Sequence, residues 1–128
     1  MTQGLADTTV FIARESGRAL RWDDLPEELA VSVITIGELR AGVLAADDVA
    51  TRDRRLSTLT QALALHPVPI DEQVAEAWSR LRLLLRDSGQ RMGVNDSWIA
   101  ATAMAMNVAI VTQDNGYVDV PGLLVVTV

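Results

Sequence analysis

The sequence contains neither cysteine nor lysine, and it has a single histidine. The absence of cysteine excludes disulfides, thiol catalysis and most structural zinc sites. The absence of lysine excludes P-loop nucleotide hydrolases, whose GK[ST] motif places a lysine on the phosphates. Receiver domains and haloacid-dehalogenase-type phosphatases pair a lysine with their aspartates, so they become poor candidates as well. No G-x-G-x-x-G dinucleotide motif is present.

Long apolar runs and excess positive charge are also missing. No apolar stretch reaches the ~18 residues of a membrane span, and MTQGLADTTVF lacks the basic start and apolar centre of a signal peptide. The net charge of −6 argues against a nonspecific nucleic-acid binder. A chain of 128 residues suits one domain with one core. We therefore expect a single cytoplasmic domain, residues 1–128, with no membrane contact.

Short apolar strands alternate with helices along the chain, which is typical of a parallel sheet covered on both faces. Strands are expected at 5–11, 29–35, 108–112 and 123–126, with a short extended piece at 67–70. Helices are expected at 36–46, at 49–65, from a cap at Asp71 to just before Gly89, and at 95–106. The predicted fold class is α/β, with a central parallel sheet of four to five short strands and helices on both faces.

Four acidic residues fall where such a sheet would bring them together. Asp7 lies at the end of the first strand, and Glu38 lies in the first turn after the second strand. Asp96 is in the first turn of its helix, and Asp114 follows the strand at 108–112. Carboxyl ends of strands and amino ends of helices share one edge of a parallel sheet, and ligands bind there. We therefore expect three of these acids to converge, with Asp96 joining them if its helix starts on the same side.

Each acid also has a purely structural interpretation. Thr35 and Glu38 fit an S/T-x-x-E capping box. Asn95 and Asp96 could cap a helix, and the other two acids could be turn residues. A cluster of all four is harder to explain in this way, because each like-charged pair ~4 Å apart costs about 4 kcal/mol at an effective dielectric of ~20.

A cation would offset this repulsion. Oxygen ligands without histidine or cysteine suit a hard ion such as Mg²⁺ or Mn²⁺. Carboxylates that hold one or two such ions support hydrolysis of phosphodiester bonds. This is the chemistry that remains after the exclusions above.

Four segments carry a more specific pattern: LADTTVFIA (5–13), SVITIGELRAGVLAA (32–46), NDSWIAATAMAMNVAIVTQD (95–114) and TQDNGY (112–117). With them the chain resembles the PIN-domain ribonucleases, and more closely the VapC-type toxins of bacterial toxin–antitoxin pairs. The combination of N-D-x-W-I-A-A, T-x-D-x-x-[FY] and E-L-R-x-G is specific. Two features depart from the family: Tyr117 stands where phenylalanine is common, and the first strand is short.

The resemblance implies a catalytic metal site with one or two Mg²⁺ or Mn²⁺ ions. Its ligands would be Asp7, Glu38, Asp96 and Asp114. Supporting roles would fall to Thr8, Thr112 and Asn95. The implied activity is that of an endoribonuclease toxin, which hydrolyses RNA with a metal-activated water. The implied partners are RNA and a VapB-type antitoxin protein, within a homodimer or a toxin–antitoxin hetero-oligomer.

Arginines near the acids are candidates for contacts with single-stranded RNA. They are Arg40, Arg14, Arg18 and Arg91, with Arg40 first because it lies two residues beyond Glu38. Each could equally be a solvated residue or a partner of the antitoxin. Two alternative functions also stay open. One is a PIN-like module that binds RNA or protein without cutting, and the other is a metal-dependent phosphatase.

Overall fold

A computed structural model describes residues 2–114 and 117–128. In this part of the chain, four parallel strands form one sheet in the order β2-β1-β3-β4. The strands are β1 (Gln3–Ala6), β2 (Glu28–Val31), β3 (Ala109–Thr112) and β4 (Val125–Thr127). The α-helices are α1 (Thr8–Glu15), α2 (Val33–Leu44), α3 (Val49–Leu63), α4 (Glu72–Ser88) and α5 (Val94–Met106), and one 3-10 turn, η1, covers Trp22–Asp24. The predicted α/β class is confirmed.

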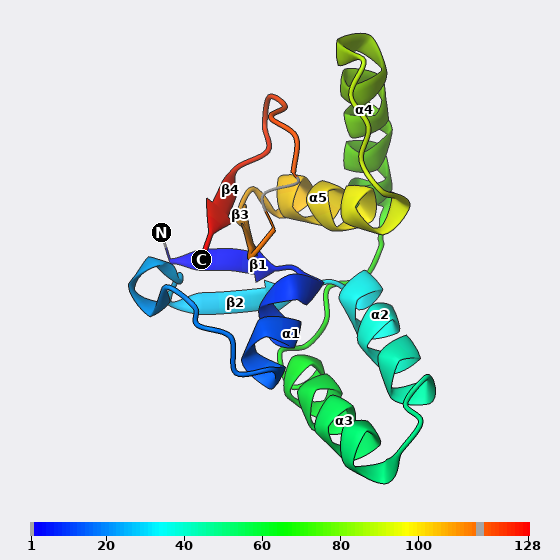
Figure 1. Cartoon of the computed structure of the whole chain (residues 1–128). Helices are drawn as coiled ribbons and strands as arrows, with labels where there is room; N and C mark the ends of the chain where they lie inside the picture. Colours follow the sequence, from blue (N-terminus) through cyan, green and yellow to red (C-terminus); the bar gives the residue numbers. More distant parts are fainter. Residues whose placement is uncertain (1, 115–116) are drawn as a thin grey trace.

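Successive residues of β1, β2 and β3 face opposite sides of the sheet, so the core has two halves. One half joins Ala6, Val31 and Val111 to apolar side chains of α1, α2 and α3. The other half joins the preceding residue of each strand to α4 and α5. Figure 1 shows this division, with α1, α2 and α3 below the sheet and α4 and α5 above it. The helices therefore cover both faces, as expected.

The expected first strand at 5–11 is wrong beyond Ala6. The side chain of Asp7 accepts a hydrogen bond from the backbone N–H of Thr9 at 3.0 Å and caps α1. The following residues are β-branched, which suggested a strand, but the cap and the burial of Val10 and Phe11 stabilise a helix instead. Asp7 thereby acquires a fixed position at the junction of β1 and α1.

The expected second strand at 29–35 is also too long. It ends at Val31, and the Ser32 side chain caps α2 by accepting from the N–H of Ile34 at 3.0 Å. Thr35 therefore lies inside the first turn of α2, and Glu38 lies one turn further along the helix. The capping-box interpretation of Thr35 and Glu38 is wrong, because Ser32 occupies the cap.

The expected helix at 36–46 is α2, which begins three residues earlier than predicted, and the remaining elements lie within about two residues of the predicted ranges. Asp71 caps α4 through the N–H of Val74, and Gly89 ends it in the left-handed region at φ 67°. Val68, in the expected extended piece, forms an isolated parallel bridge with Ser32. No helix within residues 2–114 and 117–128 combines the length and the apolar character that a membrane crossing requires.

Candidate functional site

The carboxyl edge of the sheet carries the four acids singled out in the sequence. Asp7 follows β1, Glu38 projects from α2, Asp96 lies in the first turn of α5, and Asp114 follows β3. Burial raises the pKa of Asp96 above its ordinary value, and the negative charges of the other three acids raise it further. Asp96 is therefore within electrostatic reach of the other three carboxylates.

Asp7 is the most deeply placed of the four, with 3% of its surface exposed. Its Oδ1 accepts from the N–H of Thr9 at 3.0 Å and from the Thr9 hydroxyl at 2.5 Å. Its Oδ2 accepts from the Thr112 hydroxyl at 2.6 Å. Burial raises the pKa of Asp7, and these donors partly counteract that rise. The carboxylate is thus held in a single orientation by groups from α1 and β3.

Two threonines link Asp7 to the loop that carries Asp114. The hydroxyl oxygen of Thr112 also accepts from the N–H of Asp114 at 2.9 Å. The hydroxyl oxygen of Thr9 accepts from the N–H of Gln113 at 2.9 Å. The start of the loop after β3 is therefore positioned by the same hydroxyls that bind the Asp7 carboxylate.

Glu38 is held by the first residue of α1. The Thr8 hydroxyl donates to Glu38 Oε1 at 2.6 Å, and the hydroxyls of Thr8 and Thr35 lie 3.0 Å apart. The side chains of Glu38 and Asp96 line one open cavity of about 340 Å³ together with residues of the loop before α5. A ligand could enter this space between Glu38 and Asp96. Its other lining residues are Gly93, Val94 and Asn95.

Tyr117 places a phenol beside this cluster. Its hydroxyl is buried and makes no contact of hydrogen-bond geometry with the described residues. It is nevertheless close enough to Asp7 that each group alters the pKa of the other. Burial raises the pKa of Tyr117 strongly, and the charges of Asp7 and Asp96 add to the rise. The Asn115 and Gly116 positions of the TQDNGY motif lie outside the described residues.

The structure adds residues that the sequence alone did not identify. Thr9, which binds both Asp7 and the chain at Gln113, had no predicted role, and Thr35 was assigned to a cap. The D-T-T pattern after β1 could have predicted the role of Thr9. An aspartate that caps a helix accepts from the N–H two or three residues later, which here is Thr9.

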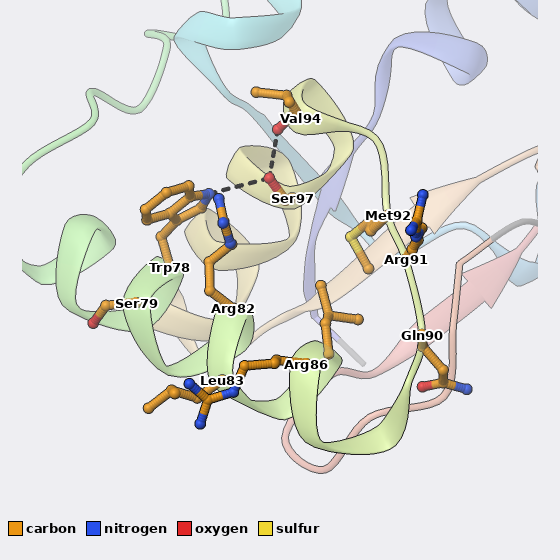
Figure 2. A pocket seen from close by; sticks show the side chains of 11 residues that line it. Trp78, Ser79, Arg82, Leu83, Arg86, Gln90, Arg91, Met92, Val94 and Ser97 are labelled. Atoms are coloured by element: carbon orange, nitrogen blue, oxygen red, sulfur yellow. Dashed lines mark hydrogen bonds between the residues drawn. The ribbon is translucent and has the colours of Figure 1, made fainter.

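The candidate RNA-binding arginines do not gather at the acids. None of the four lines the cavity between Glu38 and Asp96. Arg14, Arg18 and Arg40 are exposed on or beside α1 and α2. Arg91 lines a different cavity, between α4 and the start of α5, which Figure 2 shows.

The donor chemistry fits a hard divalent ion. The acids offer only carboxylate oxygens, which Mg²⁺ and Mn²⁺ prefer. Within the described residues, no three acidic, histidine or cysteine side chains already stand as a preformed metal-binding group. Burial raises the pKa of Asp96 most, and the charges of Asp7, Glu38 and Asp114 raise it further, so a cation would relieve the electrostatic part of that rise.

Comparison with known proteins identifies the family. The family model described as the PIN domain matches residues 5–123. The chain belongs to the PIN-domain family. Within it, the chain is 48% identical over 131 residues to Ribonuclease VapC4 of Mycobacterium tuberculosis, covering 98% of this chain and 97% of that protein. Ribonuclease VapC5 of the same organism is 43% identical over 119 residues, covering 93% of this chain and 88% of the relative.

A solved structure agrees with these sequence relationships. It is the crystal structure of VapBC-5 from Mycobacterium tuberculosis, a member of the VapBC family of toxin–antitoxin systems. This PIN domain superposes on it with a TM-score of 0.87 and 36% identity, over the full length of both chains. The VapC resemblance drawn from the four motif segments is confirmed.

Proposed function

We propose that this PIN domain is a metal-dependent endoribonuclease and the toxin of a toxin–antitoxin pair. The observation that carries the proposal is the placement of Asp7, Glu38, Asp96 and Asp114 at the carboxyl edge of the sheet, where the other three acids act electrostatically on Asp96. Four carboxylates at one edge of a sheet are suited to bind a divalent cation. The names of the relatives support the nuclease assignment, because VapC4 and VapC5 are both called ribonucleases.

A small antitoxin protein of the VapB type is the proposed partner. The similar solved structure is a VapBC toxin–antitoxin complex. This chain exposes large apolar side chains on the helices that cover one face of its sheet, namely Ile12 on α1, Leu44 on α2, and Val49, Leu56 and Leu63 on α3. Such a surface suits a partner that buries it. The expected assembly is a toxin–antitoxin hetero-oligomer or a homodimer.

Each side chain of the site has a distinct task in the proposed reaction. A bound Mg²⁺ or Mn²⁺ would neutralise the carboxylates, polarise the scissile phosphate and lower the pKa of the attacking water. Asp7 would be the fixed ligand, because Thr9 and Thr112 leave its carboxylate one orientation. Glu38 would be oriented by its hydrogen bond from Thr8.

Asp96 and Asp114 would complete the ligand set from the other side of the site. Asp96 lies in the first turn of α5, and Asp114 lies in the loop positioned by Thr112. Asn95 lines the same cavity as Asp96 and would contact the ligand shell or the RNA.

The alternative route of RNA cleavage, through a 2′,3′-cyclic phosphate, needs a general acid and a general base. The chain has no lysine, and its one histidine, His66, is exposed beyond the end of α3. The usual acid–base pair is therefore missing from the site. The expected products carry a 5′-phosphate and a 3′-hydroxyl.

The test uses purified chain, free of antitoxin, incubated with a mixed RNA pool, followed by mapping of the new ends. Cleavage should require Mg²⁺ or Mn²⁺ and stop with chelator. Asp7→Asn, Asp96→Asn and Asp114→Asn should each slow it by ~100-fold or more, equivalent to about 3 kcal/mol of transition-state stabilisation. The matched control is Asp23→Asn, which changes an exposed acid of η1.

Three results would overturn the proposal. Products ending in cyclic phosphate, or full activity in chelator, would exclude the metal route. Binding of RNA without any cleavage would favour a non-cutting PIN module. Release of phosphate from a phosphomonoester, with intact RNA, would favour a phosphatase.

A further inference from the structure

A second cavity lies beside the acid cluster, on the face of the sheet covered by α4 and α5. It has a volume of about 670 Å³, which is within the range of ligand sites. The residues around it come from α4, the loop after it and the first turn of α5, as Figure 2 shows. Three of them are arginines, Arg82, Arg86 and Arg91, and none of the described residues that line the cavity is acidic.

One residue that lines this cavity, Trp78, belongs to a stack of two aromatic rings. The indoles of Trp78 on α4 and Trp98 on α5 are 4.4 Å apart between ring centroids, with an interplanar angle of 3°. The guanidinium carbon of Arg82 lies 4.9 Å from the Trp78 ring centroid. Because Trp98 covers one face of Trp78, the guanidinium lies over the other face. Arg82 is thus held by a cation–π contact that leaves its N–H donors available to an anion.

Hydrogen bonds fix the stack to the start of α5. Trp78 Nε1 donates to Ser97 Oγ at 3.1 Å, and the Ser97 hydroxyl donates to the carbonyl of Val94 at 2.5 Å. Figure 2 shows both bonds beside the Arg82 side chain. An arginine held in this way loses little conformational entropy when it binds a ligand. Trp78 is therefore fixed in position beneath Arg82 before a ligand arrives.

The two cavities of this region adjoin each other at one residue. Val94 lines both the arginine cavity and the cavity between Glu38 and Asp96. Ser97, which holds Trp78, directly follows Asp96 in the sequence. A chain that lies across the acids would pass over the first turn of α5 into the arginine cavity.

The charge of this surface opposes that of the whole chain. The net charge is −6, yet three of the 11 arginines line one cavity whose described lining holds no acid. Arg86 forms an ion pair with Asp87 at 3.2 Å, but both side chains are about 70% exposed, so the pair contributes little. The positive charge of this lining favours an anionic ligand.

We propose that this cavity binds the phosphate backbone of single-stranded RNA beside the scissile bond. The inference rests on the proposed ribonuclease function and assigns a substrate subsite to it. Arg82, oriented by Trp78, is the central phosphate contact, and Arg86 and Arg91 bind from its two sides. A flanking base can stack on the exposed face of the Arg82 guanidinium, as bases do on arginine and aromatic planes in single-stranded complexes.

The first arm of the test measures binding in the absence of chemistry. The probe is a fluorescein-labelled single-stranded RNA of mixed sequence, titrated by anisotropy with the purified full chain in chelator at several salt concentrations. The double change Arg82→Gln with Arg86→Gln should weaken binding by roughly tenfold or more. It should also lower the salt slope by about 0.7 for each phosphate that the variant no longer neutralises. Arg91→Gln changes the loop and does not touch the stack, so it tests the cavity even if α4 variants lose stability.

The matched control is Arg80→Gln. Arg80 lies on the same helix and pairs with Glu76 at 2.6 Å, outside the cavity. Arg80→Gln removes one positive charge, as Arg91→Gln does, but it lies outside the cavity, so its RNA affinity should stay near that of the unmodified chain. Affinities of the cavity variants that match this control would overturn the proposal.

The second arm measures steady-state cleavage in Mn²⁺. The cavity variants should show a higher KM and a nearly unchanged kcat. Failure of the unmodified chain to cleave would contradict the proposed function, while the binding arm would still decide the cavity. A changed oligomeric state of the variants in light scattering, with unchanged RNA affinity, would assign the surface to contact between copies and overturn the RNA site.

Discussion

The hydroxyl of Thr112, at the end of β3, donates a 2.6 Å hydrogen bond to Oδ2 of Asp7, the residue that follows β1. Both residues are buried, with 0% and 3% of their surfaces exposed. The same hydroxyl oxygen accepts from the N–H of Asp114. One threonine therefore positions two acids that follow neighbouring strands, and the site depends on the register of β1 with β3.

Thr112→Val keeps the shape of this side chain and removes its hydroxyl. Asp7 would lose a charge-assisted donor in a buried environment, which should cost about 1.5–3 kcal/mol in the free energy of unfolding. RNA cleavage should fall by ~10-fold or more, because Asp7 and the Asp114 loop lose their shared support. Urea denaturation and a cleavage assay measure the two effects.

Thr102→Val is the matched control for this substitution. Thr102 is also fully buried, but its hydroxyl donates to the carbonyl of Trp98 within α5 and contacts no acid of the site. The control should lose some stability and retain its cleavage rate. Equal losses of cleavage in both variants would show that Thr112 acts only through general stability.

Divalent ions should stabilise the folded chain. At an ion concentration ~100 times the dissociation constant, the gain is about 2.7 kcal/mol and appears as a higher Tm. Asp96→Asn should remove most of this gain and raise the Tm of the metal-free chain, because it relieves repulsion from Asp7, Glu38 and Asp114. Thermal scans across millimolar Mn²⁺ measure the effect, with Asp23→Asn as the control. A Tm that does not respond to Mn²⁺ would count against the metal site.

Stability of the metal-free chain should carry an unusual pH dependence. The pKa of Asp96 is raised on folding, so between its ordinary value of about 3.9 and the raised value the folded chain binds more protons than the unfolded chain. Its contribution to the free energy of unfolding therefore falls as the pH rises through this window. The advantage of Asp96→Asn over the unmodified chain should grow over the same window and then stay constant.

Asp48 provides a contrast of opposite sign. Hydrogen bonds from Thr51 lower the pKa of Asp48 at the cap of α3. Its contribution is present above the ordinary pKa and is lost as the pH falls toward the lowered value. Asp48→Asn should therefore lose stability mainly at higher pH. If the stabilities of Asp96→Asn and Asp48→Asn, relative to the unmodified chain, changed with pH in the same direction, that result would contradict the raised pKa of Asp96.

The positions of the acids could be predicted from the sequence although some element boundaries could not. The sequence predicts Asp7 at the sheet edge, although the strand predicted there extends five residues too far. The predicted position of Asp7 is still correct, because ligand sites of parallel sheets lie where strands end and helices begin. The β-branched run after Asp7 suggested a strand, and only the cap and the burial of Phe11 make it helical.

Contacts between segments far apart in the sequence could not be predicted from sequence patterns. Thr8 and Glu38 are 30 residues apart and meet only because α1 packs against α2. The stack of Trp78 on Trp98 joins α4 to α5 in the same way. Local spacing predicts which face of one helix is apolar, but the partner on another helix depends on how the two helices cross.

Trp98→Phe should cost stability with little change in catalysis. Trp98 lies two residues after Asp96, and the sequence favoured packing over base stacking as its role. Its indole stacks on Trp78 and so is covered on that face. The loss of a stacked pair costs about 0.5–1.5 kcal/mol beyond the lost buried area. Trp22→Phe, at a 62% exposed position, is the control for both assays. A large loss of RNA affinity at unchanged stability would assign Trp98 to the substrate instead.

Glu38→Gln separates the chemical role of this residue from its structural one. Glutamine keeps the length of the side chain, and its carbonyl oxygen can still accept the hydrogen bond from Thr8. Only the negative charge is lost. Because Ser32 caps α2, the helix should not weaken, and relief of repulsion with Asp96 should leave stability equal or higher. Cleavage should fall by ~100-fold or more if the charge binds the metal.

The companion substitution Thr8→Val keeps the Glu38 charge and removes its hydrogen-bond donor. Its expected effect on cleavage is smaller, roughly 10-fold, and appears as weaker Mn²⁺ affinity because Glu38 is less well oriented. Glu27→Gln, at an exposed position before β2, controls for the change in net charge. Full activity of Glu38→Gln in saturating Mn²⁺ would remove Glu38 from the ligand set and leave a site of three aspartates, in which Thr8 and Glu38 serve only to join α1 to α2.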